Sequence, residues 1–235
     1  MISNHKVDCS NKQEQPKYRL KRRKRTMNFE SLSQKLRYLI EAKGDISEHL
    51  LTLVQYSQQC ETILELGVRG VVSSWAFLYG LLLNNKSKKC LYLNDITECD
   101  IRELQSAAQT FQVNIKYAWC NDLELAFTPD DKIELVFIDT WHVYGQLKRE
   151  LAKFGKIAQK YIILHDTTVD EYVGESIRMG KNIEEDCLKN KMTYSEVIVG
   201  LWPAVVEFLK ENPQWVLRER FKNNNGLTVL EKKAN

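Results

Sequence analysis

The sequence predicts an α/β fold with a doubly wound β-sheet of seven strands. Between about residues 62 and 164, five short apolar runs of strand length alternate with stretches of helical periodicity, which is the pattern of parallel strands joined by crossover helices. Two further strand-like runs, 215–221 and 227–230, flank Asn223-Asn224-Asn225-Gly226, a turn sequence typical of hairpins. We therefore expect the sheet to end in a C-terminal antiparallel hairpin.

Residues 27–60 precede the first strand and are expected to form N-terminal helices. Apolar residues recur there at helical spacing, with Gly44 expected to end one helix and Ser47 expected to cap the next. The apolar positions are Phe29, Leu32, Leu36, Leu39 and Ile40, then Leu50, Leu51 and Val54. Helices in this position could form a lid over a site or a homodimer contact.

The elements of the parallel region are expected in strict alternation. Strands are expected at 62–66, 90–93, 113–119, 133–138 and 161–164, and helices at 71–83, 97–111 and 144–158. Thr97 and Asp100 have the spacing of a capping box, so we expect Thr97 to begin the second helix. A further helix is expected at 203–209, and the irregular stretch 167–199 is where a lid or substrate loop would lie.

Composition and charge narrow the classes of protein. The chain has 235 residues, of which 43% are hydrophobic and 28% charged, and this excludes an intrinsically disordered, fibrous or disulfide-stapled protein. Residues 1–26 carry nine Lys or Arg and two acidic residues, so the net charge of +3 divides into +7 there and −4 elsewhere. We expect 1–26 to be a disordered basic arm, either a solvated linker or a nuclear-import, RNA or membrane contact.

The cysteines and the hydropathy indicate the compartment. Six scattered cysteines include no C-x-x-C pair, so neither a zinc ribbon nor a thioredoxin-like motif is indicated. The first 26 residues lack the apolar region of a secretory signal, and the most apolar run, Val71–Leu83, is too short to span a bilayer. We therefore expect a cytoplasmic protein with no membrane span.

Acidic residues gather at the expected strand ends. Each of the five strands has a carboxylate at or close to its end, namely Glu65, Asp95, Asp122, Asp139 and Asp166, and two of the four histidines, His142 and His165, lie at the same edge. Ligands of open α/β sheets bind beyond the carboxyl ends of the strands. The sequence therefore predicts a binding site at this edge, although capping of the following helices is an ordinary alternative for Asp139 and Asp166.

The turn after the first strand reads Glu65-Leu66-Gly67-Val68-Arg69-Gly70. Gly67 allows a tight turn and Gly70 the close approach of a ligand, but the G-x-G-x-x-G dinucleotide fingerprint is absent. Glu65 would repel a pyrophosphate and suits a cationic ligand, while Asp95 is well placed for ribose hydroxyls. The plain alternative is a tight turn with a surface acid.

These residues resemble the motifs of class I S-adenosylmethionine-dependent methyltransferases, whose Rossmann-like sheet also ends in an antiparallel hairpin. The segments Phe137–Tyr144, Leu164–Thr167, Trp202–Ala204 and Asn223–Leu230 narrow the resemblance to the branch of macrocin-type sugar O-methyltransferases and cephalosporin hydroxylase-like proteins. The resemblance covers about residues 45–231, and it implies a methyltransferase domain over 61–235.

The resemblance implies that S-adenosyl-L-methionine is the cofactor. The residues implied to bind it are Glu65, Gly67, Arg69, Gly70, Ser73, Asp95, Ile96, Asn121, Asp122, Asp139 and Trp141. Trp141 and Tyr172 are alternatively walls for a sugar or packing residues, and Trp202 is expected to pack in the core.

The resemblance also implies a metal and a base. In the sugar-methylating branch, an acid after the fourth strand and two acids after the fifth hold Mg²⁺, and a histidine three residues beyond the first acid is the proposed general base. Asp139, His142 and Asp166 match, but His165 replaces one acid. His165 therefore either shifts the preference of an Asp139, His165 and Asp166 site toward Mn²⁺ or abolishes metal binding.

The activity implied is methyl transfer to a sugar hydroxyl of a small molecule or glycan, free or nucleotide-linked, with His142 and Asp139 as the catalytic residues. Alternatives are a natural-product methyltransferase or hydroxylase-like enzyme, an RNA methyltransferase that uses the basic arm, and a non-catalytic cofactor-binding scaffold. The acidic body argues against nucleic acid as a partner.

Overall fold

The computed structural model describes residues 27–127 and 131–233, so the expected basic arm lies outside the described residues. The chain forms a seven-stranded sheet in the order β3-β2-β1-β4-β5-β7-β6. The strands are β1 (Thr62–Leu66), β2 (Cys90–Asp95), β3 (Asn114–Trp119), β4 (Ile133–Ile138), β5 (Ala158–His165), β6 (Trp215–Phe221) and β7 (Leu227–Lys232). β1 to β5 are parallel, and β7 pairs antiparallel with both β5 and β6. The doubly wound sheet and its closing hairpin are confirmed.

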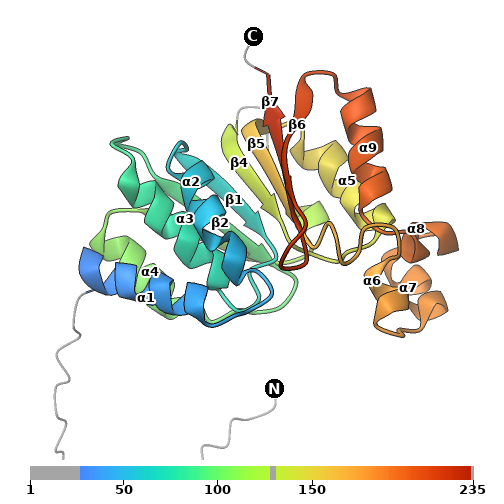
Figure 1. Cartoon of the computed structure of the whole chain (residues 1–235), viewed down its shortest axis with the longest axis horizontal. Helices are drawn as coiled ribbons and strands as arrows, with labels where there is room; N and C mark the ends of the chain where they lie inside the picture. The colour runs from blue at the N-terminus through green and yellow to red at the C-terminus, as the bar shows by residue number, and fades with distance from the viewer. Residues whose placement is uncertain (1–26, 128–130, 234–235) are drawn as a thin grey trace, which may run out of the picture.

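Helices cover both faces of this sheet. They are α1 (Phe29–Glu41), α2 (Leu50–Ser57), α3 (Val72–Leu83), α4 (Arg102–Thr110), α5 (Tyr144–Phe154), α6 (Glu175–Arg178), α7 (Ile183–Asn190), α8 (Tyr194–Ile198) and α9 (Trp202–Glu211), with short 3₁₀ turns η1 (Ser47–His49) and η2 (Asp122–Glu124). Figure 1 shows α2 and α3 on one side of the sheet and α5 and α9 on the other. No helix of the described part is long and apolar enough to cross a membrane.

The strand side chains alternate between two hydrophobic clusters. Ile63, Leu135 and Ile163 pack with α1 to α4 on one face, while Leu64, Val136 and Ile162 pack with α5 and α9 on the other. Successive side chains of a strand point to opposite faces, so strands buried on both faces become the continuous apolar runs of the sequence. The helices of residues 27–60 belong to the first cluster through Leu32, Leu50 and neighbouring residues.

Several helix boundaries differ from the sequence expectation. Thr97 does not cap a helix, because its main-chain N–H and its hydroxyl both donate to Asp95 and α4 begins only at Arg102. Ser47 lies inside η1, where its hydroxyl accepts from the Gly44 N–H and donates to the Leu39 carbonyl. The helix expected to reach Ala158 ends at Phe154, since Ala158 already begins β5.

The stretch 167–199 also departs from the expected loop, because it folds into α6, α7 and α8. A third hydrophobic cluster, formed by Val143, Met192 and Val197 with Trp141 packed against it, holds these short helices to the start of α5. We call residues 167–199 the insert. Gly174, which precedes α6, donates its N–H to the carbonyl of Ile198, so the start of α6 is joined to the end of α8.

Candidate active site

The turn between β1 and α3 brings two strand ends into contact. Gly67 has φ +89°, and a Cβ atom there would lie 1.9 Å from the main-chain oxygen of Asp139, so only glycine fits. Arg69 and Val71 also have positive φ, +38° and +60°. A β-branched residue in this region is a rare and strained conformation. Gly70 differs from Gly67 in having space for a side chain, because the nearest atom to an added Cβ is Val72 Cγ2 at 3.7 Å.

Asp95 holds this turn in place. Its Oδ2 accepts from the N–H groups of Val68 and Arg69 at 2.9 and 2.8 Å, and its Oδ1 accepts from the N–H and hydroxyl of Thr97, both at 2.8 Å. Burial raises the pKa of this carboxyl, but the four donors outweigh burial and lower it. Contact between Asp95 and a ribose stays a prediction.

Glu65 is fully buried beneath the turn, and not on its surface. Its carboxylate accepts from the hydroxyl groups of Ser73 and, at 2.6 Å, Ser74, both in the first turn of α3. Burial raises the pKa of Glu65 to about 8, although both serine hydroxyls oppose the shift. Glu65 and Ser73 therefore contact each other, and any contact with a cofactor stays a prediction.

The other expected cofactor residues fall into two groups. Ile96 is 67% exposed beside the turn, and its carbonyl accepts at 3.0 Å from Nε1 of Trp119, a 60% exposed residue that the sequence analysis did not assign to the cofactor. Asn121 and Trp141 have structural partners instead: Asn121 Oδ1 accepts from the Leu123 N–H at 2.9 Å, and Trp141 Nε1 donates to Ser176 Oγ at 3.2 Å.

Asp122 belongs to a buried acid pair that the sequence did not indicate. Gln146 Nε2 donates to Asp122 Oδ1 at 3.1 Å and to Glu150 Oε1 at 2.8 Å, and Thr140 donates its hydroxyl to Glu150 at 2.5 Å. Burial raises the pKa of Glu150 well above its ordinary value, and the electrostatic effect of the nearby Asp122 adds to this rise. Glu150 also anchors Thr140, the residue after Asp139, by accepting its hydroxyl.

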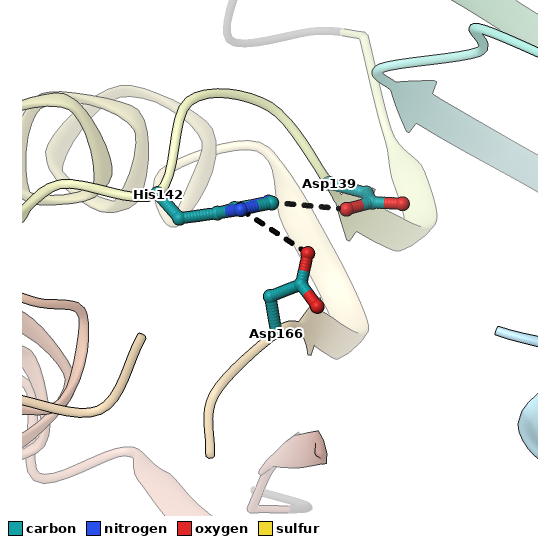
Figure 2. Close-up of side chains that lie close together, drawn as sticks. All are labelled: Asp139, His142 and Asp166. Carbon is teal, nitrogen blue, oxygen red and sulfur yellow. Dashed lines mark hydrogen bonds and ion pairs between the residues drawn. The ribbon is translucent and has the colours of Figure 1, made fainter. Parts of the chain in front are cut away.

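Asp139, His142 and Asp166 converge where β4 and β5 end (Figure 2). One ligand atom from each of the three lies within 4.8 Å of the others. His142 Nε2 lies 3.2 Å from Asp139 Oδ1, and His142 Nδ1 lies 3.1 Å from Asp166 Oδ2. Asp166 has φ +56°, which turns the chain sharply after β5. The structure therefore brings these three expected site residues together, and their catalytic and metal-binding roles stay predictions.

The insert adds two carboxylates that the sequence analysis missed. Asp170 Oδ2 and Glu175 Oε2 lie 3.3 and 3.6 Å from His142 Nδ1. Burial lowers the pKa of His142, but the surrounding carboxylates raise it to about 10, and in turn the pKa of Asp139 is lowered although burial opposes this. With this pKa the ring is positively charged at neutral pH, with a hydrogen on each nitrogen. It has to lose one of these hydrogens before it can act as a base.

His165 is buried on the other side of Asp139. Its Nε2 lies 3.1 Å from the carbonyl oxygen of Asp45, and because a carbonyl only accepts, Nε2 carries the hydrogen. Its Nδ1 therefore faces Asp139 Oδ1 at 3.4 Å and Asp166 Oδ1 at 3.6 Å. The three expected metal ligands are adjacent, with His142 as a fourth group among them.

Two solved structures share this fold. An O-methyltransferase from Bacillus cereus, in complex with SAH, is 14% identical over 86% of this chain and 90% of that chain, with a TM-score of 0.53. The O-methyltransferase TomG from Streptomyces achromogenes, involved in tomaymycin synthesis and in complex with SAM, is 13% identical over 89% of this chain and 92% of that chain, with a TM-score of 0.51. No protein-family model and no curated protein matches the sequence. These likenesses establish the fold of the chain.

Proposed function

We propose that this chain is an S-adenosylmethionine-dependent O-methyltransferase that acts on a hydroxyl group of a small molecule or glycan, and that the hydroxyl belongs to a sugar. The observation that carries the proposal is the convergence of Asp139, His142 and Asp166 beside the strained β1–α3 turn. The fold supports it, because both O-methyltransferases of similar structure were solved with SAH or SAM. A cytoplasmic enzyme without a membrane span or nucleic-acid partner is part of the same proposal.

The residues around the turn fit the cofactor. The first turn of α3 has no side-chain cap, so its N–H groups are open to an anionic group such as a carboxylate. The exposed side chains of Ile96 and Trp119 offer apolar surface to an adenine ring, and Gly70 leaves room for a ligand. Bound there, S-adenosylmethionine supplies an electrophilic methyl group on a positively charged sulfur.

The residues of the cluster also fit a divalent cation. His142 Nδ1 and Asp166 Oδ1 are buried without an aligned hydrogen bond, and His165 presents Nδ1 to Asp139 and Asp166. Its other ring nitrogen is held by a carbonyl, as is usual for a metal-ligating histidine. Two carboxylates and an imidazole suit Mn²⁺, and Mg²⁺ less well. A cation held there would lower the pKa of a hydroxyl bound to it.

His142 is the proposed general base. Its Nε2 lies on the Asp139 side of the ring, where it would receive the proton of an acceptor hydroxyl. Asp139 contacts both His142 and His165, so it would fix the position of the base relative to the cation. Trp141 is committed to Ser176 and the insert, which leaves the exposed Tyr172 as the aromatic residue that supports a sugar-binding wall.

Calorimetry with SAM and SAH tests the cofactor, and transfer of a labelled methyl group to a panel of sugars and natural-product alcohols tests the acceptor. We expect dissociation constants in the micromolar range, about −7 to −9 kcal/mol, and a labelled sugar. Absence of SAH binding at millimolar concentration would refute the function. Binding with label only on a non-sugar alcohol would replace the sugar by the natural-product alternative, which the TomG likeness favours.

A further inference from the structure

Four carboxylates surround His142, and they form two pairs that differ in their cationic partners. One pair is Asp170 and Glu175, and the other is Asp139 and Asp166. Asp170 accepts from Arg178 Nε at 2.6 Å and Nη2 at 2.8 Å, and Glu175 accepts from Lys181 Nζ at 2.8 Å. Among the residues that the structure describes, no lysine or arginine nitrogen forms an ion pair with Asp139 or Asp166. Asp170 and Glu175 are therefore each paired with a lysine or arginine, while Asp139 and Asp166 have only His142 and His165 as ion-pair partners among the described residues.

Glu175 of the insert also holds the main chain of His142, through one hydrogen bond to its carbonyl and one to its N–H. The Glu175 N–H donates to the His142 carbonyl at 2.9 Å, and the His142 N–H donates to Glu175 Oε2 at 3.3 Å. One residue of α6 thus fixes both peptide groups of His142. Such contacts are unnecessary for a surface histidine, and they set the direction in which its ring leaves the backbone.

Asp170 stands behind the ring. It is fully buried, and its Oδ2 lies 3.3 Å from Nδ1, whereas Asp139 lies on the side of Nε2. The main chain of Asp170 is also fixed, since its N–H donates to the Asp166 carbonyl at 3.1 Å and its carbonyl accepts from the Leu201 N–H at 2.8 Å. Nδ1 is thus turned toward Asp170 and, at 3.1 Å, Asp166 Oδ2, while Nε2 is turned toward Asp139.

We propose that Asp170 and Glu175 are positioning residues, which fix the His142 ring with Nδ1 toward the insert and Nε2 toward Asp139, while Asp139 and Asp166 are the cation ligands. The ion pairs with Arg178 and Lys181 hold these two carboxylates in place on the insert side of the ring. This inference rests on the proposed function, because it assigns roles within the same cluster.

Titration of the full-length chain with Mn²⁺, followed by the electron paramagnetic resonance of the free ion, tests the division of the carboxylates. Asp139→Asn and Asp166→Asn should each weaken Mn²⁺ binding by about 100-fold or more, and Asp170→Asn and Glu175→Gln by less than about threefold. A loss in Asp170→Asn as large as that in Asp166→Asn would make Asp170 a ligand and overturn the proposal. Absence of Mn²⁺ binding to the unaltered protein would overturn it too, while SAH binding reports separately on the proposed function.

Nitrogen NMR of ¹⁵N-histidine-labelled protein, saturated with Mg²⁺, tests the positioning. Asp170→Asn and Glu175→Gln should shift the His142 ring resonances, because each removes a carboxylate that fixes the orientation of the ring. Glu171→Gln is the matched control, since Glu171 lies in the same segment but pairs with Arg220, and it should leave them unchanged. Identical ring resonances in all variants would overturn the positioning role. If Asp170→Asn fails to fold by circular dichroism, Glu175→Gln carries the same test.

Discussion

The carbonyl oxygen of Asp45 accepts a hydrogen bond from His165 Nε2 across 120 positions of sequence. The carboxylate of the same residue pairs with Arg69 of the β1–α3 turn at 2.5 Å. A single residue between α1 and η1 therefore touches both the turn assigned to the cofactor and the cluster assigned to the cation. The ion pair with Arg69 is exposed, and exposed pairs contribute little to stability. Its effect is to hold Asp45 where its carbonyl can accept from His165.

His165→Glu should shift the metal preference toward Mg²⁺. The substitution replaces a nitrogen that faces Asp139 and Asp166 by carboxylate oxygens, which Mg²⁺ prefers. We expect the ratio of the Mg²⁺ to the Mn²⁺ dissociation constant to fall by about tenfold, measured by calorimetry. His49→Gln is the control, since its Nε2 instead contacts the Asn223 and Asn224 carbonyls. An unchanged ratio in His165→Glu would remove His165 from the ligand set.

Gly70→Val should separate cofactor binding from folding. An added side chain at Gly70 meets little of the protein, so the melting temperature should stay nearly constant while SAH binding weakens by about tenfold or more. Gly67→Ala is the contrasting variant, because its Cβ would collide with the Asp139 main chain. We expect it to unfold readily whether or not a ligand is present. Full SAH affinity in Gly70→Val would mean that the ligand does not approach this turn.

The stability of the protein should fall as pH rises from about 4.5 to about 8. Burial raises the pKa of Glu65 from 4.5 to about 8 in the folded state, so over this interval the folded protein keeps a proton that the unfolded chain releases. Glu65→Gln cannot titrate, and at pH 8 it should be more stable than the unaltered protein by about 4 kcal/mol. Urea denaturation at pH 5 and pH 8 measures both. Equal pH slopes for the two proteins would contradict the prediction.

His142→Ala should reduce methyl transfer by about 10²–10⁴-fold while SAH affinity barely changes. The ring faces carboxylates and not the glycine turn, so its removal takes away the proton acceptor and leaves the cofactor surface intact. Steady-state turnover on the acceptor found by the methyl-transfer screen, with calorimetry of SAH, measures the two quantities. Full turnover of the variant would assign proton removal to another group.

A chelator should abolish methyl transfer, and Mn²⁺ should restore it. The carboxylates of Asp139 and Asp166 have histidines as their ion-pair partners, so without a cation they hold His142 protonated. Turnover measured before and after EDTA treatment, then after addition of MnCl₂ or MgCl₂, checks this. Undiminished activity in excess EDTA would show that the cation has no part in the reaction.

The sequence predicted the sheet well because its signals are local. All seven strands lie where apolar runs occur, and β1 and β4 were bounded to the residue, since Gly67 and Asp139 mark abrupt changes of polarity. The failures have tertiary causes. Thr97 has the spacing of a cap, but Asp95 offers it a closer partner, and nothing local in 167–199 indicates that the insert folds against Val143 and Trp141.

The candidate site was predictable in outline only. Residues at strand ends, such as Asp139 and Asp166, meet because parallel strands place their carboxyl ends together. Asp170 and Glu175 reach His142 from the insert, and Gln146 of α5 donates to both Asp122 and Glu150. Such contacts join elements whose relative placement no spacing rule gives. The burial of Glu65 was likewise not predictable from the sequence. This acid was expected to face a ligand, and it instead accepts hydrogen bonds from two serines.

The position of β7 has a consequence for how the chain is made. β5 and β6 are neighbours of β7 but not of each other, so β5 receives its second neighbour only after residues 227–232 have left the ribosome. Until then, β5 is an open edge that carries Ile162, Ile163 and Leu164. Such an edge is prone to pair with other chains, and the nascent protein therefore depends on prompt docking of its hairpin to avoid aggregation.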